Sequence, residues 1–178
     1  MTRNEYNNQV KKALEYYEKA NIVLTEEEKN SVEVADFGKG DVNSIGLQLV
    51  VYINTDRVCA KEMVLLPKQT CPEHMHVDTN GQPGKEETFR CRYGEVYLYV
   101  EGDNNSANIK AELPDSTFSV FQEIVLKEGE QYTIMPKTLH WFQAGPNGAV
   151  ISEFSTRSTD ETDFFTDREI VRETKIED

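Results

Sequence analysis

The three histidines of this 178-residue chain lie in two short stretches that could together bind a metal ion. His74 and His76 belong to the run Cys71-Pro-Glu-His-Met-His76, and His140 belongs to the run Leu139-His-Trp-Phe142. Neutral imidazole is a ligand that borderline divalent metals favour, and carboxylates commonly complete such sites. The sequence therefore predicts a metal site that uses all of its histidines together with an acidic residue.

The acidic ligand is expected close to the histidine pair. Residues i and i+2 of a strand point to the same face, so His74 and His76 aim together. A turn-rich stretch follows from Asp78 to Gly84, and the β-prone run that begins at Glu87 would return beside the histidines. Glu86 is adjacent to Glu87, and strand alternation cannot choose between the two across a loop of unknown shape. His140 must then arrive from a distant strand.

Composition indicates one folded domain. The chain has 38% hydrophobic and 29% charged residues and a net charge of −13. An acidic chain repels nucleic acid and anionic membranes, so we expect neither as a partner. Three cysteines without a CxxC spacing argue against a disulfide framework. The first residues lack an apolar signal core, and no apolar stretch is long enough to span a bilayer, so we expect a cytoplasmic protein.

We expect three consecutive parts. Residues 1–40 form a helical segment, since Tyr6, Val10, Leu14 and Tyr17 recur at helical spacing and Thr25 opens a capping box. Residues 41–156 form a β-barrel with the metal site, and residues 157–178 form a polar tail. The strands expected in the barrel are 46–53, 58–66, 87–93, 95–101, 118–126, 131–135 and 149–154, with Gly94 and the stretch 145–148 as breaks.

The histidine spacing, the glutamate and the later His140 resemble the two motifs of the cupins. The likeness is closer to the bacterial D-lyxose isomerases, which are small sugar isomerases of the cupin class. The stretches that carry it are 46–49, 54–57, 61–62, 70–74, 87–94, 131–133 and 140–145. The resemblance covers about residues 16–167 and extends well beyond the histidines.

The resemblance implies a fold, a cofactor and an activity. It implies a cupin-type jelly-roll β-barrel and a homodimer. It implies a divalent metal, usually Mn²⁺ (alternatives are Co²⁺, Fe²⁺, Ni²⁺ or Zn²⁺), held by His74, His76, Glu87 and His140. It also implies that a free pentose or hexose is isomerised, D-lyxose to D-xylulose and D-mannose to D-fructose, by metal-assisted hydrogen transfer between C1 and C2.

Such a transfer needs an acid and a base beside the reacting carbons. Lys61 interrupts the apolar run 58–66 and Glu153 interrupts the run 149–154, so Lys61 is the candidate acid or oxygen-binding donor and Glu153 the candidate base. A solvated edge strand is the competing interpretation for Lys61. Asp163 and Arg157 are candidates for binding sugar hydroxyls, against a merely solvated tail. Phe142, which shares the parity of His140, is a candidate pocket wall, against ordinary core packing.

Three other functions stay open on the residues alone. An iron dioxygenase uses the same three histidines and one glutamate, and it needs no acid–base pair. A phosphosugar isomerase needs a phosphate clamp. Arg90 and Arg92 lie opposite to Glu87 by strand parity, so we do not expect them to line the metal cavity and form such a clamp. A non-catalytic sugar-binding cupin would keep the barrel but would not need Lys61 and Glu153 turned inward.

Overall fold

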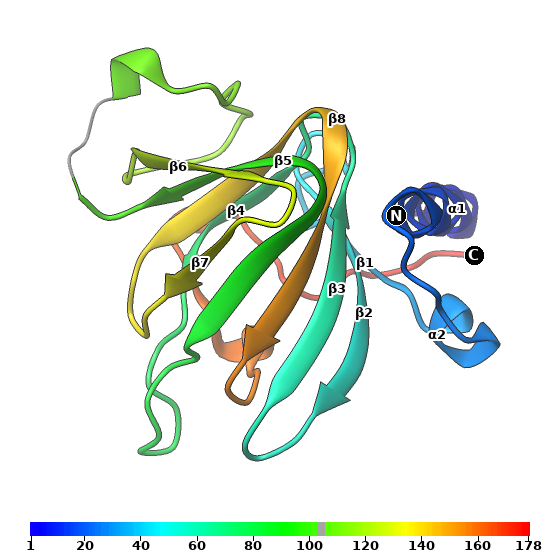
Figure 1. Ribbon diagram of the computed structural model, residues 1–178, viewed down its shortest axis with the longest axis horizontal. Helices are drawn as coiled ribbons and strands as arrows, with labels where there is room; N and C mark the ends of the chain where they lie inside the picture. Colours follow the sequence, from blue (N-terminus) through cyan, green and yellow to red (C-terminus); the bar gives the residue numbers. More distant parts are fainter. Residues whose placement is uncertain (103–105) are drawn as a thin grey trace.

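The computed structural model describes residues 1–102 and 106–178, and it consists mainly of strands (Figure 1). The chain begins with α1 (Arg3–Lys19), α2 (Glu26–Asn30) and the short β1 (Glu33–Ala35). The expected all-β class with N-terminal helices is confirmed. The remaining strands are β2 (Leu47–Asn54), β3 (Cys59–Leu65), β4 (Thr70–Met75), β5 (Glu87–Val100), β6 (Gln122–Lys127), β7 (Gln131–Ile134), β8 (His140–Ser155) and β9 (Phe164–Phe165), and 3-10 turns lie at Ser106–Asn108 and Asp160–Thr162.

β8 is the central strand of a curled sheet. It pairs with β5 along most of its length, with β4 near its beginning and with β3 near its end. β2 and β1 continue the sheet from β3, β9 continues it from β4, and β6 and β7 pair with β5. The sheet curls around an apolar interior that includes Leu49, Met63, Phe89 and Phe142. Strands far apart in the sequence are thereby brought to one cavity.

The two helices cover the outer face of the sheet beside β2 and β3 (Figure 1). Both begin with a capping box, from Thr2 and from Thr25, as the sequence predicts for the second helix. The buried side chains Ala13 and Tyr17 of α1 pack with Val64 and Val150 of the sheet. The apolar stripe of the first helix is therefore a packing surface, outside the cavity.

Two strands run through the glycines that were expected to end them. β5 continues across Gly94, and β8 continues across the stretch 145–148. The pairing register of β5 and β8 shifts at this point, so β8 accommodates its extra residues as a bulge. Gly94 has a positive φ of 71°, and a Cβ atom there would lie 2.1 Å from the carbonyl oxygen of Gly148. These glycines allow a close approach of two continuous strands.

The last residues, 157–178, form a segment that we call the C-terminal strap. It pairs with β4 through β9, and Thr166 Oγ donates a 2.6 Å hydrogen bond to the buried carboxylate of Glu73. Farther along, the Val171 amide donates to the Phe37 carbonyl at 3.0 Å. The strap is thus attached to the barrel at several points. Among the described residues, no helix is both long and apolar enough to cross a membrane.

Candidate metal centre and active site

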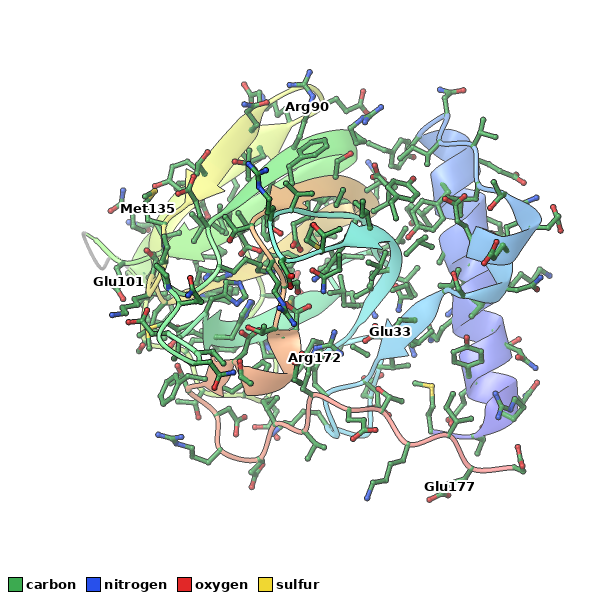
Figure 2. The ribbon with its side chains drawn as sticks, turned by 90° about the horizontal axis from the view of Figure 1, so that it is seen from below. Glu33, Arg90, Glu101, Met135, Arg172 and Glu177 are labelled. Carbon is green, nitrogen blue, oxygen red and sulfur yellow. The ribbon has the colours of Figure 1, made fainter. Side chains whose placement is uncertain are left out.

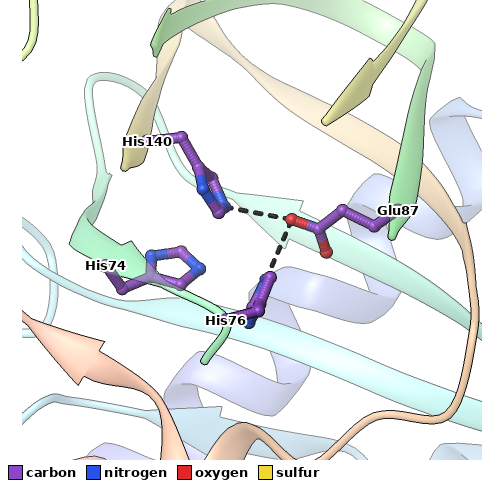
Figure 3. Close-up of side chains that lie close together, drawn as sticks. All are labelled: His74, His76, Glu87 and His140. Atoms are coloured by element: carbon purple, nitrogen blue, oxygen red, sulfur yellow. Dashed lines mark hydrogen bonds and ion pairs between the residues drawn. The ribbon is translucent and has the colours of Figure 1, made fainter. Parts of the chain in front are cut away.

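Four buried side chains form a compact group inside the barrel (Figure 3). One oxygen of Glu87 lies 3.1 Å from Nε2 of His76 and 3.0 Å from Nε2 of His140. The His74 ring lies beside both other imidazoles, with centroids 4.2 Å from His140 and 5.0 Å from His76. The structure therefore brings together the four residues that the family resemblance implies as metal ligands. We call His74, His76, Glu87 and His140 the metal group.

The strands explain how these residues meet. His74 on β4 pairs directly with His140, which opens β8. His76 follows the last residue of β4 and shares the inward face. Glu87 opens β5 and is buried, whereas the neighbouring Glu86 is exposed. Strand alternation at the start of β5 thus selects Glu87, a choice that the sequence left open.

Each imidazole is oriented by a hydrogen bond at Nδ1. Nδ1 of His74 donates to the Pro72 carbonyl at 2.9 Å, and Nδ1 of His140 donates to the Thr138 carbonyl at 2.9 Å. Nδ1 of His76 donates to the Asp163 carboxylate at 2.7 Å. These bonds account for the proton on Nδ1, so in the neutral form of each ring the lone pair lies on Nε2.

The donor set fits a divalent metal ion. Three imidazole nitrogens and one carboxylate oxygen suit manganese, iron, cobalt, nickel or zinc. Nε2 of His140 is fully buried and has no hydrogen-bond partner with good geometry among the described residues. A buried acceptor of this kind is costly without a partner, and a metal ion would satisfy it.

Electrostatics favour the ligand forms of two members of this group. Burial alone would raise the pKa of Glu87, but Lys85 and His76 hold that pKa well below its usual range, so Glu87 is a carboxylate. Burial, with the neighbouring histidines, lowers the pKa of His74 well below its usual range. Burial likewise opposes the charged form of His76, but Glu87 and Asp163 outweigh it and raise its pKa to about 9. At neutral pH and in the absence of a metal, the His76 ring therefore carries a proton on both nitrogens.

A second set of buried charges lies next to the metal group. Nζ of Lys85 lies 2.8 Å from Glu87, 3.1 Å from Glu153 and 3.2 Å from Asp160. Lys61 lies 2.6 Å from Asp160 and 3.6 Å from Glu153. Opposite charges in a buried site need such pairing, since an unpaired one would be expensive. Lys61 and Glu153 are paired across β3 and β8 and both point inward, so the solvated-edge interpretation of Lys61 is wrong.

Both lysines are ammonium groups in this environment. Burial favours neutral lysine, but for Lys61 the nearby Glu153 and Asp160 raise the pKa above its ordinary value. Burial also favours the neutral form of Lys85. The nearby Glu153, Glu87 and Asp160 outweigh this effect and raise the pKa of Lys85 well above its ordinary value. Each lysine can donate hydrogen bonds but cannot accept a proton. A base in this cavity must therefore be a carboxylate.

The C-terminal strap contributes to the same cavity. Asp163 reaches His76, and Phe165 lies against the His74 ring with centroids 5.7 Å apart. The solvated-tail interpretation of Asp163 is therefore wrong. Arg157, also considered for sugar binding, is exposed and pairs with Asp56 at 2.6 Å, away from the cavity.

The enclosed space at this centre is small. Phe142 lines it and packs edge-on against Phe89, so it serves both as a wall and as core. The cavity measures about 30 Å³, room for only about two water molecules. A pentose, the substrate that the family resemblance implies, has ten non-hydrogen atoms, so it would fit only if some of the lining side chains moved.

Three residues of this cavity escaped the sequence analysis: Lys85, Asp160 and Arg172. Lys85 lies two residues before Glu87, so strand parity could have placed it on the same face. Asp160 and Arg172 lie in the strap, whose sequence has no periodic pattern that distinguishes inward from outward residues. Arg90 and Arg92 point away from the metal group, to Gln131 and Ser152, as parity predicted.

The comparison with known families decides the class of protein. The model of the family described as D-lyxose isomerase matches residues 13–178. The chain belongs to the D-lyxose isomerase family. It is therefore an isomerase, and the family supersedes the dioxygenase and the non-catalytic binding protein as alternatives.

Relatives and solved structures agree with this family. A D-lyxose/D-mannose isomerase of Thermosediminibacter oceani is 59% identical over 170 residues, which are 94% of this chain and 93% of that protein. A D-lyxose ketol-isomerase of Cohnella laeviribosi is 57% identical over 92% of this chain and 91% of that protein. The L-ribose isomerase of Acinetobacter sp. DL28, solved with L-ribose, superimposes with a TM-score of 0.75 at 18% identity, over 99% of this chain and 98% of that one. At that identity the match supports the fold alone, and the expected cupin-type jelly-roll is confirmed.

Proposed function

We propose that this protein interconverts D-lyxose and D-xylulose, and also D-mannose and D-fructose. Hydrogen moves between C1 and C2 of the open-chain sugar. The observation that carries the proposal is the contact of two buried groups: the three histidines and Glu87 on one side, and Lys85, Glu153 and Lys61 on the other. An isomerase needs a site for the sugar oxygens beside a site for proton transfer, and these two neighbouring groups would serve as the two sites.

The metal is proposed to be Mn²⁺, held by His74, His76, Glu87 and His140. When bound it supplies a Lewis acid that polarises the sugar carbonyl and stabilises negative charge on oxygen. The role of Asp163 is to fix the His76 ring, so that Nε2 faces the other ligands. The role of Glu87 is to complete the donor set as a carboxylate.

Proton transfer is assigned to Glu153. Its carboxylate is buried, and it is held by Lys85 at 3.1 Å and by the Ser155 hydroxyl at 3.0 Å. In the aldose-to-ketose direction it takes the proton from C2, which leaves an enediolate, and returns it to C1, while the proton of the C2 hydroxyl passes to the oxygen on C1. Because Lys61 and Lys85 stay protonated, they donate hydrogen bonds to the sugar oxygens on which charge develops. Asp160 keeps both ammonium groups in place.

Substrate contacts and assembly are part of the same proposal. Asp163 lies close enough to the cavity to accept hydrogen bonds from sugar hydroxyls, and Phe142 forms an apolar wall behind the sugar carbons. The active species is proposed to be a homodimer. Its molar mass in solution should be about twice the 20.4 kDa of one chain.

Product analysis tests the proposal. The manganese-loaded protein is incubated with D-lyxose or with D-mannose in D₂O, and the products are identified by NMR. D-xylulose or D-fructose with deuterium at C1 is the expected result, since the proton on Glu153 exchanges with solvent. Ketose without any deuterium would contradict the role of Glu153. Oxygen consumption without ketose would contradict the isomerase proposal itself.

A further inference from the structure

A row of alternating charges leads from the metal group to the surface. It begins at Glu87, continues through Lys85 at 2.8 Å, and reaches Asp160 at 3.2 Å. Asp160 lies 3.8 Å from Arg172 of the strap, and Arg172 pairs with Glu33 of β1 at 2.6 Å. Figure 2 shows Arg172 and Glu33 side by side, where the strap passes β1. The metal group therefore stands at the inner end of this row, and the pair of Arg172 and Glu33 stands at its outer end.

Arg172 also separates two spaces. One is the cavity of about 30 Å³ at the metal group. The other is an outer groove of about 760 Å³, bounded by β1, the edge of β2 and the strap. Residues that line both are Leu49, Lys61, Asp160 and Arg172. The wall between cavity and groove is thus made of these side chains.

Within this wall Arg172 has the greatest freedom to turn. Leu49 and Lys61 belong to paired strands. Asp160 is held by Lys61, Lys85 and the Ser158 hydroxyl. Arg172 comes from an irregular part of the strap, its side chain is 21% exposed, and its close partner Glu33 is 44% exposed. In the structure the guanidinium pairs closely with Glu33 and lies 3.8 Å from Asp160. Loss of Glu33 would let it draw closer to Asp160 and narrow the cavity, and loss of the Arg172 side chain would join the two spaces.

We infer that Arg172 lies at the end of the sugar site farthest from the metal and sets the preference between five-carbon and six-carbon aldoses. The inference rests on the proposed function, because it places C1 and C2 at the metal group. The last carbon of the sugar then points along the row of charges to Arg172. The guanidinium offers five N–H donors to hydroxyls there. A hexose needs room for one more CHOH unit, and the groove beyond Arg172 provides such room.

Two variants should shift the preference in opposite directions. Arg172→Ala joins the cavity to the groove, so the ratio of kcat/KM for D-mannose to kcat/KM for D-lyxose should rise about fivefold or more. A change of this size is typical when one side group is added to or removed from a pocket. Glu33→Gln removes the outer carboxylate, so Arg172 turns toward Asp160 and the same ratio should fall at least about twofold. Arg168→Ala is the matched control, since Arg168 lies on the same strap but is exposed and stacks on Phe164.

Equilibrium binding provides a readout apart from turnover. Calorimetry compares D-arabinitol and D-mannitol, the unreactive reduced forms of D-lyxose and D-mannose, with each variant. Arg172→Ala should favour D-mannitol relative to the unsubstituted protein, with unchanged metal content. A ratio within twofold of the original, in both turnover and binding, would overturn the inference. If the Arg172→Ala variant fails to fold, an unchanged ratio in the Glu33→Gln variant would overturn the inference. Failure of the unsubstituted protein to isomerise either sugar would instead refute the proposed function.

Discussion

Nδ1 of His76 lies 2.7 Å from the carboxylate of Asp163, so a residue of the C-terminal strap orients a member of the metal group. The two residues are 87 positions apart in the sequence. The strap therefore contributes to the candidate metal centre and is more than a cover over the barrel.

Replacing Asp163 by Asn should weaken metal binding. The amide lacks the charge that makes His76 a stronger ligand, so affinity for Mn²⁺ should fall about 10- to 100-fold. Competition with a chromogenic chelator measures this affinity. Asp167→Asn is the control, because Asp167 lies on the same strap but bonds to Lys39 and Ser116. Equal Mn²⁺ affinity of the Asp163→Asn variant and the original protein would show that the contact has no role in the centre.

Replacing Glu153 by Gln should abolish turnover and leave the metal in place. The amide keeps the shape of the side chain but cannot take up a proton, so kcat should fall about a hundred- to ten-thousand-fold. Steady-state rates with D-lyxose, together with metal analysis, separate the two effects. Glu86→Gln serves as control, since that side chain is exposed near the same site. A Glu153→Gln variant with full activity would remove Glu153 from the mechanism.

Metal binding should tighten as pH rises. The pKa of His76 is raised to about 9 from an ordinary 6.5, yet only neutral imidazole binds a metal. Affinity for Mn²⁺ should therefore increase by up to about tenfold per pH unit between about 6.5 and 9. Calorimetry in two buffers of different ionisation enthalpy should detect about one proton released per ion at pH 7.5. An affinity that does not vary with pH in this window would contradict the proton on His76.

The raised pKa of His76 has the opposite effect on the stability of the metal-free fold. The pKa of His76 is higher in the folded state than in the unfolded chain, so the folded state binds more protons between about pH 6.5 and 9. The stabilisation from His76 is complete below 6.5 and is lost as pH rises through 9. Denaturant unfolding of the metal-free protein should show this decline.

Strand alternation explains what could be read from the sequence. It correctly placed His74 and His76 together and Arg90 and Arg92 on the opposite side, because these positions lie in or next to regular strands. It could not choose Glu87 over Glu86, since the loop before β5 hides the phase of the strand. Once Glu87 is known to point inward, strand alternation also places Lys85, two residues earlier, on the inward face.

The rest depends on contacts that no local pattern encodes. Asp160 begins a 3-10 turn and Arg172 comes from irregular backbone. Their inward direction follows from the pairing of β9 with β4 and from the ion pair of Arg172 with Glu33 on β1. Glycine is common in turns, so the sequence predicts that a strand ends at Gly94. In the structure it permits a close approach to Gly148, which only the long-range pairing of β5 and β8 reveals.

The account depends most on a metal held by the three histidines and Glu87. The most direct test is the rate of D-xylulose formation from D-lyxose by metal-stripped protein, followed while Mn²⁺ is added back. We expect negligible turnover without metal and a rate that rises until one ion is bound per chain. Full turnover by the stripped protein, or no ketose from protein with a filled site, would contradict the central claim.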